Sequence, residues 1–107
     1  MKSRIFILQE AEDDIFELYK YILENDSKES AIYVYEQLRE KINSLDEYPE
    51  RGHCPPELER IGVTGFLEIH FKPYRIIYEI DGRQVFIHAV LDGRREIQSL
   101  LERRMFR

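Results

Sequence analysis

The residues best suited to chemistry lie in the last third of the chain. Polar and apolar side chains alternate along residues 74–80, a turn follows at residues 81–82, and the alternation resumes toward a basic corner at residues 92–95. Such alternation predicts β-strands, in which successive side chains point to opposite faces. The face opposite the core then collects Arg75, a cation that could hold a phosphate, and His88, which could move a proton.

Turn length predicts which side chains meet across these strands. A two-residue turn after Ile80 places Arg75 opposite His88. A two-residue corner after Phe71 places His70 opposite Arg75, so we expect a row of His70, Arg75 and His88 across three strands. The other face is apolar, must be covered by helices, and comprises Leu67, Ile69, Phe71, Tyr74, Ile76, Tyr78, Val85, Ile87, Ala89 and Leu91.

Glu68 and Glu79 join the polar face in this register, so carboxylates lie beside cations there. In one interpretation the face is a cationic patch with adjacent titratable groups that binds a phosphate. In the other it is a solvated sheet surface, where cross-strand charge pairs add stability. The residues alone favour the solvated surface.

Composition predicts a single folded domain over residues 1–107, a length too short for two domains. An apolar content of 43% with seven Tyr and six Phe is typical of a globule. The apolar run after Arg4 is far shorter than a membrane span or a secretion signal. We therefore expect no membrane association. Because the only cysteine, Cys54, cannot form an internal disulfide, we also expect a cytoplasmic protein.

The net charge of −5 is divided unequally along the chain. Residues 10–50 hold thirteen acidic and four basic residues, whereas residues 51–107 hold eight acidic and ten basic residues. A protein that follows nucleic acid along its backbone needs a broad basic field. Any nucleic-acid contact is therefore expected to be local to the basic C-terminal cluster of Arg94, Arg95, Arg103, Arg104 and Arg107.

No metal site or cofactor is predicted. His53 and Cys54 are adjacent, but the three histidines are scattered and only one cysteine is present, so the spacing of a metal site is missing. The glycines show no pattern that would cradle a phosphate.

Hydrophobic periodicity predicts the elements that position these side chains. Residues 2–8 form a short strand, and a stripe every three or four residues predicts a helix from residue 11 to about 25. Ser27 is expected to cap a second helix that runs to about residue 47. Residues 48–65 form a long loop, because they hold three of the four prolines and three of the five glycines.

Three strands and a helix over residues 96–106 complete the chain. The order β-α-α-β-β-β-α predicts an α+β fold with an N-terminal strand and a helical hairpin. The hairpin is expected to pack on a three- to four-stranded antiparallel sheet, with a short C-terminal helix at the end.

Four segments together resemble the RelE/ParE superfamily of bacterial type II toxins. They are residues 11–22, Pro-Pro-Glu-Leu at 55–58, Lys-Pro-Tyr-Arg-Ile-Ile-Tyr-Glu-Ile at 72–80, and residues 90–101. The resemblance spans nearly the whole chain and implies a RelE/ParE-like domain that inhibits growth when free. It also implies neutralisation by a cognate antitoxin encoded beside it, in a complex that binds operator DNA through the antitoxin.

The superfamily holds two mechanisms, since RelE-like members cut mRNA on the ribosome and ParE-like members poison DNA gyrase. For a nuclease, the resemblance assigns Arg75 to phosphate stabilisation and Glu57 to the general base. Arg94 would be a further basic group, with His70 and His88 as neighbouring titratable groups.

The nuclease constellation is incomplete in this sequence. Only Lys72 represents its lysine cluster near the sheet, and leucines lie near the place of its terminal acid. The helical hairpin of about 37 residues and the acidic charge resemble ParE-like members more closely. We therefore expect gyrase poisoning ahead of mRNA cleavage, and an inactive relative that acts only as a binding module is a third alternative. The expected target-binding residues are Arg94, Arg95, Arg103 and Arg104.

Overall fold

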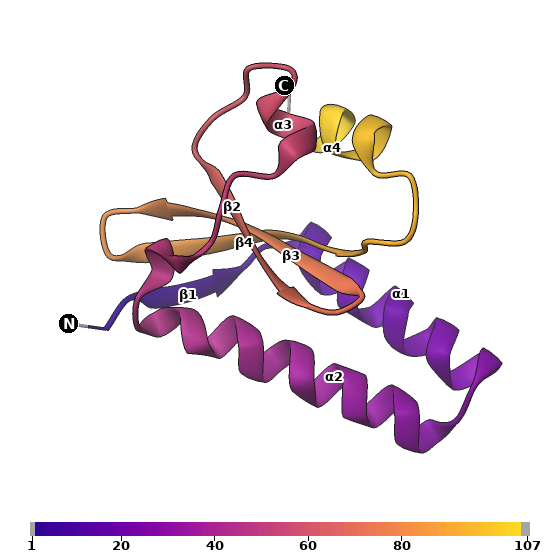
Figure 1. Ribbon diagram of the computed structural model, residues 1–107. Helices are drawn as coiled ribbons and strands as arrows, with labels where there is room; N and C mark the ends of the chain where they lie inside the picture. Colours follow the sequence, from indigo (N-terminus) through magenta and orange to yellow (C-terminus); the bar gives the residue numbers. More distant parts are fainter. Residues whose placement is uncertain (1, 106–107) are drawn as a thin grey trace.

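Four strands form one mixed sheet at the centre of the molecule (Figure 1). The computed structural model describes residues 2–105. β2, β3 and β4 are antiparallel as predicted, whereas β1 is parallel to β4. The prediction of an antiparallel sheet is wrong for this pair, because helices rather than a tight turn follow β1. In the sheet order β1-β4-β3-β2, the strands are β1 (Arg4–Ile7), β4 (Gln84–Asp92), β3 (Tyr74–Asp81) and β2 (Phe66–Phe71).

The helical hairpin covers one face of the sheet (Figure 1). It consists of α1 (Gln9–Asn25) and α2 (Lys28–Asn43), and Ser27 caps α2 as predicted by accepting the Ser30 backbone N–H at 3.1 Å. A 3₁₀ turn, Ser44–Asp46, completes the stretch predicted as helix. None of the helices within residues 2–105 has the length and apolarity needed to span a bilayer. The main core buries Ala11, Ile15, Ile22, Ala31, Leu38, Ile42, Leu45, Tyr74, Ile76, Tyr78, Val85, Ile87 and Val90.

Two short helices cover part of the opposite face. α3 (Pro56–Glu59) arises within the predicted loop, after a 3₁₀ turn at Pro49–Arg51, and α4 (Gln98–Met105) lies beside it (Figure 1). The predicted placement of Ala89 and Leu91 under the hairpin is wrong, because both side chains pack against these helices instead. The second core comprises Leu58, Ile77, Ala89, Leu91, Ile97 and Leu101.

The turn between β3 and β4 starts one residue later than predicted. Its two loop residues are Gly82 and Arg83, because Asp81 pairs with Gln84. Gly82 has a φ of +62°, a conformation that glycine adopts without strain. Near the turn, each β3 residue therefore lies opposite a β4 residue two positions later than predicted. Because a shift of two residues keeps side chains on the same face, the faces are unchanged.

A β-bulge in β4 does change the faces, because it leaves His88 without an opposite residue in β3. An extra residue in one strand inverts the alternation beyond it. Arg75 therefore lies opposite Leu91, and the predicted row is wrong at His88. The predicted pairing of His70 with Arg75 across β2 and β3 is confirmed.

Side chains complete the outer edge of β4 where β1 ends. Asp14 accepts the backbone N–H of Val90 at 2.9 Å, and Arg104 donates to the carbonyl of His88 at 2.7 Å. An ion pair of 3.0 Å joins Arg104 to Asp14. Burial has the largest influence on Asp14 and raises the pKa of its carboxyl. These contacts tie α1, β4 and α4 together at the bulge.

The connection between α2 and α3 passes very close to the sheet at Gly52. The Tyr78 hydroxyl donates to the Pro49 carbonyl at 2.6 Å. One residue past Gly52, His53 pairs with Glu68 of β2 through two backbone hydrogen bonds of 2.7 and 3.2 Å. A Cβ atom on Gly52 would collide with the Tyr78 hydroxyl and lie 2.7 Å from the Glu68 carbonyl oxygen, so only glycine fits.

Gly52→Ala is expected to destabilise the fold, because the backbone of β2 cannot yield to the added methyl group. Overpacking of this kind costs about 1–3 kcal/mol, which urea unfolding would measure. Thr64→Ala, at an exposed position between α3 and β2, is the control. Equal unfolding free energies for Gly52→Ala and the wild type would contradict the close approach.

Candidate functional site

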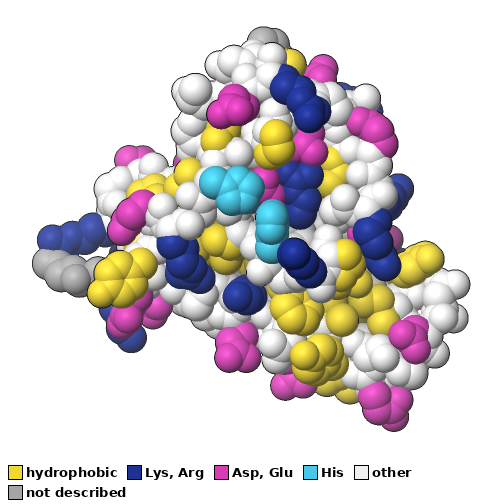
Figure 2. Space-filling view, in the orientation of Figure 1, with side chains coloured by type: hydrophobic (Ala, Val, Ile, Leu, Met, Phe, Trp, Pro, Cys, Tyr) yellow, Lys and Arg dark blue, Asp and Glu magenta, His cyan; other side chains and the backbone are white. Residues whose placement is uncertain are grey.

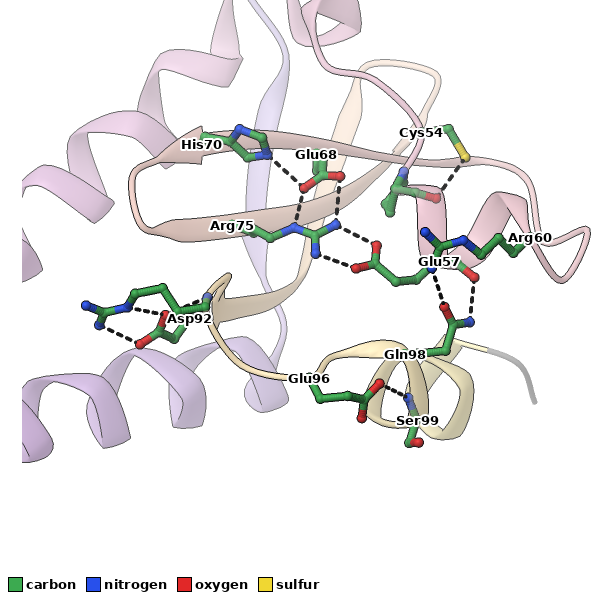
Figure 3. A network of polar contacts seen from close by, with 12 residues as sticks. Cys54, Glu57, Arg60, Glu68, His70, Arg75, Asp92, Glu96, Gln98 and Ser99 are labelled. Carbon is green, nitrogen blue, oxygen red and sulfur yellow. Dashed lines mark hydrogen bonds and ion pairs between the residues drawn. The ribbon is translucent and has the colours of Figure 1, made fainter.

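Arg75 lies between two carboxylates beside α3 (Figure 3). Its Nη1 and Nη2 donate to the two oxygens of Glu57 at 2.7 and 2.8 Å. Its Nε and Nη2 donate to the two oxygens of Glu68 at 2.6 and 2.9 Å. Both contacts are bidentate, the arrangement in which guanidinium and carboxylate bind most strongly. One arginine is thus held by two acidic side chains from different elements.

The three side chains are largely removed from solvent. Their exposed fractions are 13% for Arg75, 15% for Glu57 and 1% for Glu68. Hydrogen bonds from Arg75 hold the pKa of Glu57 below its usual range. Hydrogen bonds to both carboxylates raise the pKa of Arg75 further. Two carboxylates and one guanidinium give the cluster a formal charge of −1.

Local structure explains how these side chains meet. Glu57 lies in the first turn of α3, which Pro56 begins, a position where proline is favoured. Glu68 and Arg75 lie on the same face of the hairpin formed by β2 and β3. Gln98 of α4 donates to the Glu57 carbonyl at 2.8 Å and so fixes α3 beside α4.

Gly93 packs against the stem of Arg75. Its N–H donates to the Pro73 carbonyl at 2.8 Å, and an added Cβ would lie 3.0 Å from the Arg75 Cδ atom. The predicted basic corner therefore supports the Arg75 side chain through its glycine, as well as presenting charge.

Of the residues proposed for a nuclease, the structure brings Glu57, His70 and Arg75 together. Glu68 links them, because its Oε1 lies 2.9 Å from His70 Nε2 and also accepts from Arg75. Sequence reasoning placed Glu68 on this face without selecting it. The signal was available, since Glu68 lies two residues before His70 in a strand and must point to the same side.

His88 and Arg94 do not join the cluster. The Nε2 atom of His88 lies 2.7 Å from Glu79 Oε1 instead. Arg94 lines a hollow of about 420 Å³ in front of Arg75, but its guanidinium pairs with Asp92 at 2.7 Å. The five side chains expected in a nuclease site are therefore split between three places.

The basic residues expected at a target surface differ in exposure. Arg94, Arg95 and Arg103 are exposed. Arg104 is only 13% exposed and is bound to Asp14. This structural role argues against a target contact through the Arg104 guanidinium.

The contact between Glu57 and Arg75 predicts acid sensitivity. Because Arg75 holds the folded-state pKa of Glu57 below its ordinary 4.5, this carboxylate stabilises the fold above that pH. The stabilisation is lost as the pH falls through the lower folded-state value. Glu57→Gln should therefore be less stable than the wild type near neutral pH, with a gap that narrows below pH 4.5.

Urea unfolding between about pH 7 and about pH 3 measures this gap. Glu59→Gln, at an exposed position of the same helix, should follow the wild-type curve. A difference between Glu57→Gln and the wild type that stays constant with pH would count against the ionic contribution.

Comparison with known proteins agrees with this fold. Residues 5–97 match the family described as ParE toxin of type II toxin-antitoxin system, parDE. No curated protein sequence matches the chain. A solved chain from the chromosomal ParDE TA system of P. aeruginosa superposes with a TM-score of 0.69 at 15% identity, covering 83% of this chain and 94% of that chain. This likeness confirms the predicted α+β fold. Because the family match covers most of the sequence, the chain belongs to the ParE toxin family of type II toxin-antitoxin systems.

Proposed function

We propose that this toxin inhibits growth by binding a protein target, DNA gyrase, and not by cleaving mRNA. The observation that carries the proposal is the double clamp on Arg75 by Glu57 and Glu68. Arg75 is the residue on which a nuclease of this superfamily would depend.

A ribonuclease needs a cationic group that is free to stabilise the charge developing on the scissile phosphate. Arg75 instead donates four hydrogen bonds to its two carboxylate partners. The formal charge of the three side chains is −1, so Arg75 brings no excess positive charge for a phosphate. Releasing Arg75 would deprive Glu68, a carboxylate that is only 1% exposed, of its guanidinium partner, and that is costly.

Charge elsewhere also favours a protein target. The chain carries a net charge of −5, with the acidic residues concentrated in the helical hairpin. A factor that enters an RNA-lined ribosomal site benefits from a strong basic field. The exposed bases Arg94, Arg95 and Arg103 are our candidates for contacts with gyrase. This target implies a cytoplasmic protein, in agreement with the free thiol of Cys54.

We also propose that the antitoxin covers an apolar groove between α1 and α2. The groove has a volume of about 480 Å³ and is lined largely by apolar and aromatic side chains. Phe16 is 59% exposed there, and Ile32 and Tyr35 are each 39% exposed. An exposed apolar surface of this kind is typical of an interface, and an amphipathic helix fits such a groove.

Expression of the chain alone in a bacterium tests the choice of target. We expect DNA breaks and filamentation while protein synthesis continues, and loss of supercoiling by gyrase with the purified toxin. Early translation arrest with cleaved ribosome-bound mRNA would overturn the proposal. Normal growth would favour the alternative of an inactive relative.

Glu57→Gln separates the two mechanisms further. Removing a general base lowers the rate of a nuclease about 100- to 10,000-fold. Under the gyrase proposal the variant retains inhibition of supercoiling within a few-fold, because Glu68 still holds Arg75. Growth inhibition by Glu57→Gln, with Glu59→Gln as the matched control, provides the measurement. Loss of toxicity in a folded Glu57→Gln protein would contradict our proposal.

Substitutions in the groove test the antitoxin surface. Burying a large apolar side chain contributes about 1.5–3 kcal/mol, so Phe16→Ser and Ile32→Ser should each weaken binding of the neighbouring gene's protein roughly tenfold or more. Both positions are exposed, so the fold should be preserved. Tyr48→Ser, at a side chain that is 76% exposed outside the groove, is the control. Unchanged affinity of both groove variants in titration calorimetry would place the antitoxin elsewhere.

A further inference from the structure

Two histidines gather around the buried carboxylate of the cluster. His53, Glu68 and His70 each offer one ligand atom, and the three atoms all lie within 4.8 Å of one another. Figure 2 shows histidine side chains next to one another near the centre of the view, between basic and acidic side chains. The contacts of Arg75 described above do not use either imidazole.

We propose that His53, Glu68 and His70 form a binding site for a divalent transition-metal ion, with Zn²⁺ as the best-fitting representative. Two imidazole nitrogens and one carboxylate oxygen are a ligand set that Zn²⁺ accepts, with a fourth position left to solvent or to a partner. The inference is independent of the choice between gyrase and mRNA as target.

The distances suit such an ion with small side-chain movements. Zn²⁺ binds nitrogen and oxygen at about 2.0–2.2 Å, so tetrahedral ligand atoms lie about 3.3 Å apart. His70 Nε2 lies 2.9 Å from Glu68 Oε1, and His53 Nδ1 lies 3.8 Å from Glu68 Oε2. The imidazoles are 62% and 39% exposed, for His53 and His70 respectively, so both can rotate toward an incoming ion.

The backbone holds the ligands in place before any ion arrives. His70 follows Glu68 by two residues in β2, so both side chains point to the same face. His53 is fixed to Glu68 by the two backbone hydrogen bonds that the close approach at Gly52 allows. The ligands therefore come from one strand and from a segment pinned to it, which lowers the entropic cost of binding.

Arg75 and Glu57 support the site without being ligands themselves. Arg75 donates to both oxygens of Glu68 and so orients that carboxylate, as hydrogen-bond partners commonly do for ligands of metal ions. Its positive charge opposes the ion, but Glu57 and Glu68 together outweigh it by one negative charge. Each carboxylate oxygen offers two lone pairs, so Glu68 can bind an ion while it keeps Arg75.

Cys54 lies next to His53 but faces away from the site. Its Sγ is 3.7 Å from the Pro55 carbonyl oxygen, and burial raises the pKa of the thiol, which disfavours the thiolate that metal ions bind. An ion at the site would instead bond the connection between α2 and α3 to the edge strand β2.

Calorimetric titration of the full chain with ZnCl₂ tests the proposal. All proteins carry Cys54→Ser, which removes the thiol as a competing ligand. We expect one ion per chain, and at least a tenfold loss of affinity in His53→Gln and in His70→Gln. His88→Gln is the matched control, since His88 pairs with Glu79 outside the site, and its affinity should equal that of the parent.

NMR of the parent protein gives a readout that does not depend on the folding of variants. Zn²⁺ should shift the imidazole resonances of His53 and His70 and leave those of His88 unchanged. No binding below about 1 mM Zn²⁺, or equal affinity in the parent, His53→Gln and His70→Gln, would overturn the proposal. Shifts confined to His88 would do the same.

Discussion

The ion pairs of Arg75 are the interaction on which the side of the sheet that carries α3 depends. One guanidinium joins β3 to Glu68 of β2 and to Glu57 of α3. Because Glu68 is almost fully buried, loss of Arg75 would leave a charge without its partner, which costs about 3–5 kcal/mol in comparable buried pairs. This contact therefore helps to hold α3 against the sheet and orients the Glu68 carboxylate, whose neighbours include two histidines.

The same interaction limits what the fold can do. A guanidinium that points from a sheet toward a solvent-filled hollow could stabilise a phosphate, and the hollow in front of Arg75 has about 420 Å³. Here two carboxylates of the protein, rather than a phosphate, accept the hydrogen bonds of the guanidinium. Gly93 packs against the stem of the Arg75 side chain. The arginine therefore has a structural role, and its charge is already neutralised by carboxylates of the protein.

Sequence patterns predicted the parts of the structure that depend on local periodicity. The helical hairpin, the Ser27 cap and the pairing of His70 with Arg75 are examples. The bulge at His88 was not predictable, because three apolar residues flank His88 on each side and can be buried in either register. The approach of His53 to Glu68 depends on a contact across fifteen residues of sequence, which no local pattern encodes. Of the candidate site, the residue types were predicted, whereas the partners that determine their chemistry were not.

The bulge also explains why counting charges along the sequence overstates the basic surface. It frees the Val90 N–H and the His88 carbonyl at an edge that β1 is too short to cover, and Asp14 and Arg104 satisfy them. Arg104 is thereby withdrawn from the surface, as Arg75 is by its carboxylates. Two arginines of the basic half thus act inside the protein, and within residues 2–105 the C-terminal basic cluster keeps Arg94, Arg95 and Arg103 as its exposed members. A small patch of this kind can position a protein partner, but it cannot follow the backbone of a nucleic acid, which requires many phosphate contacts at once.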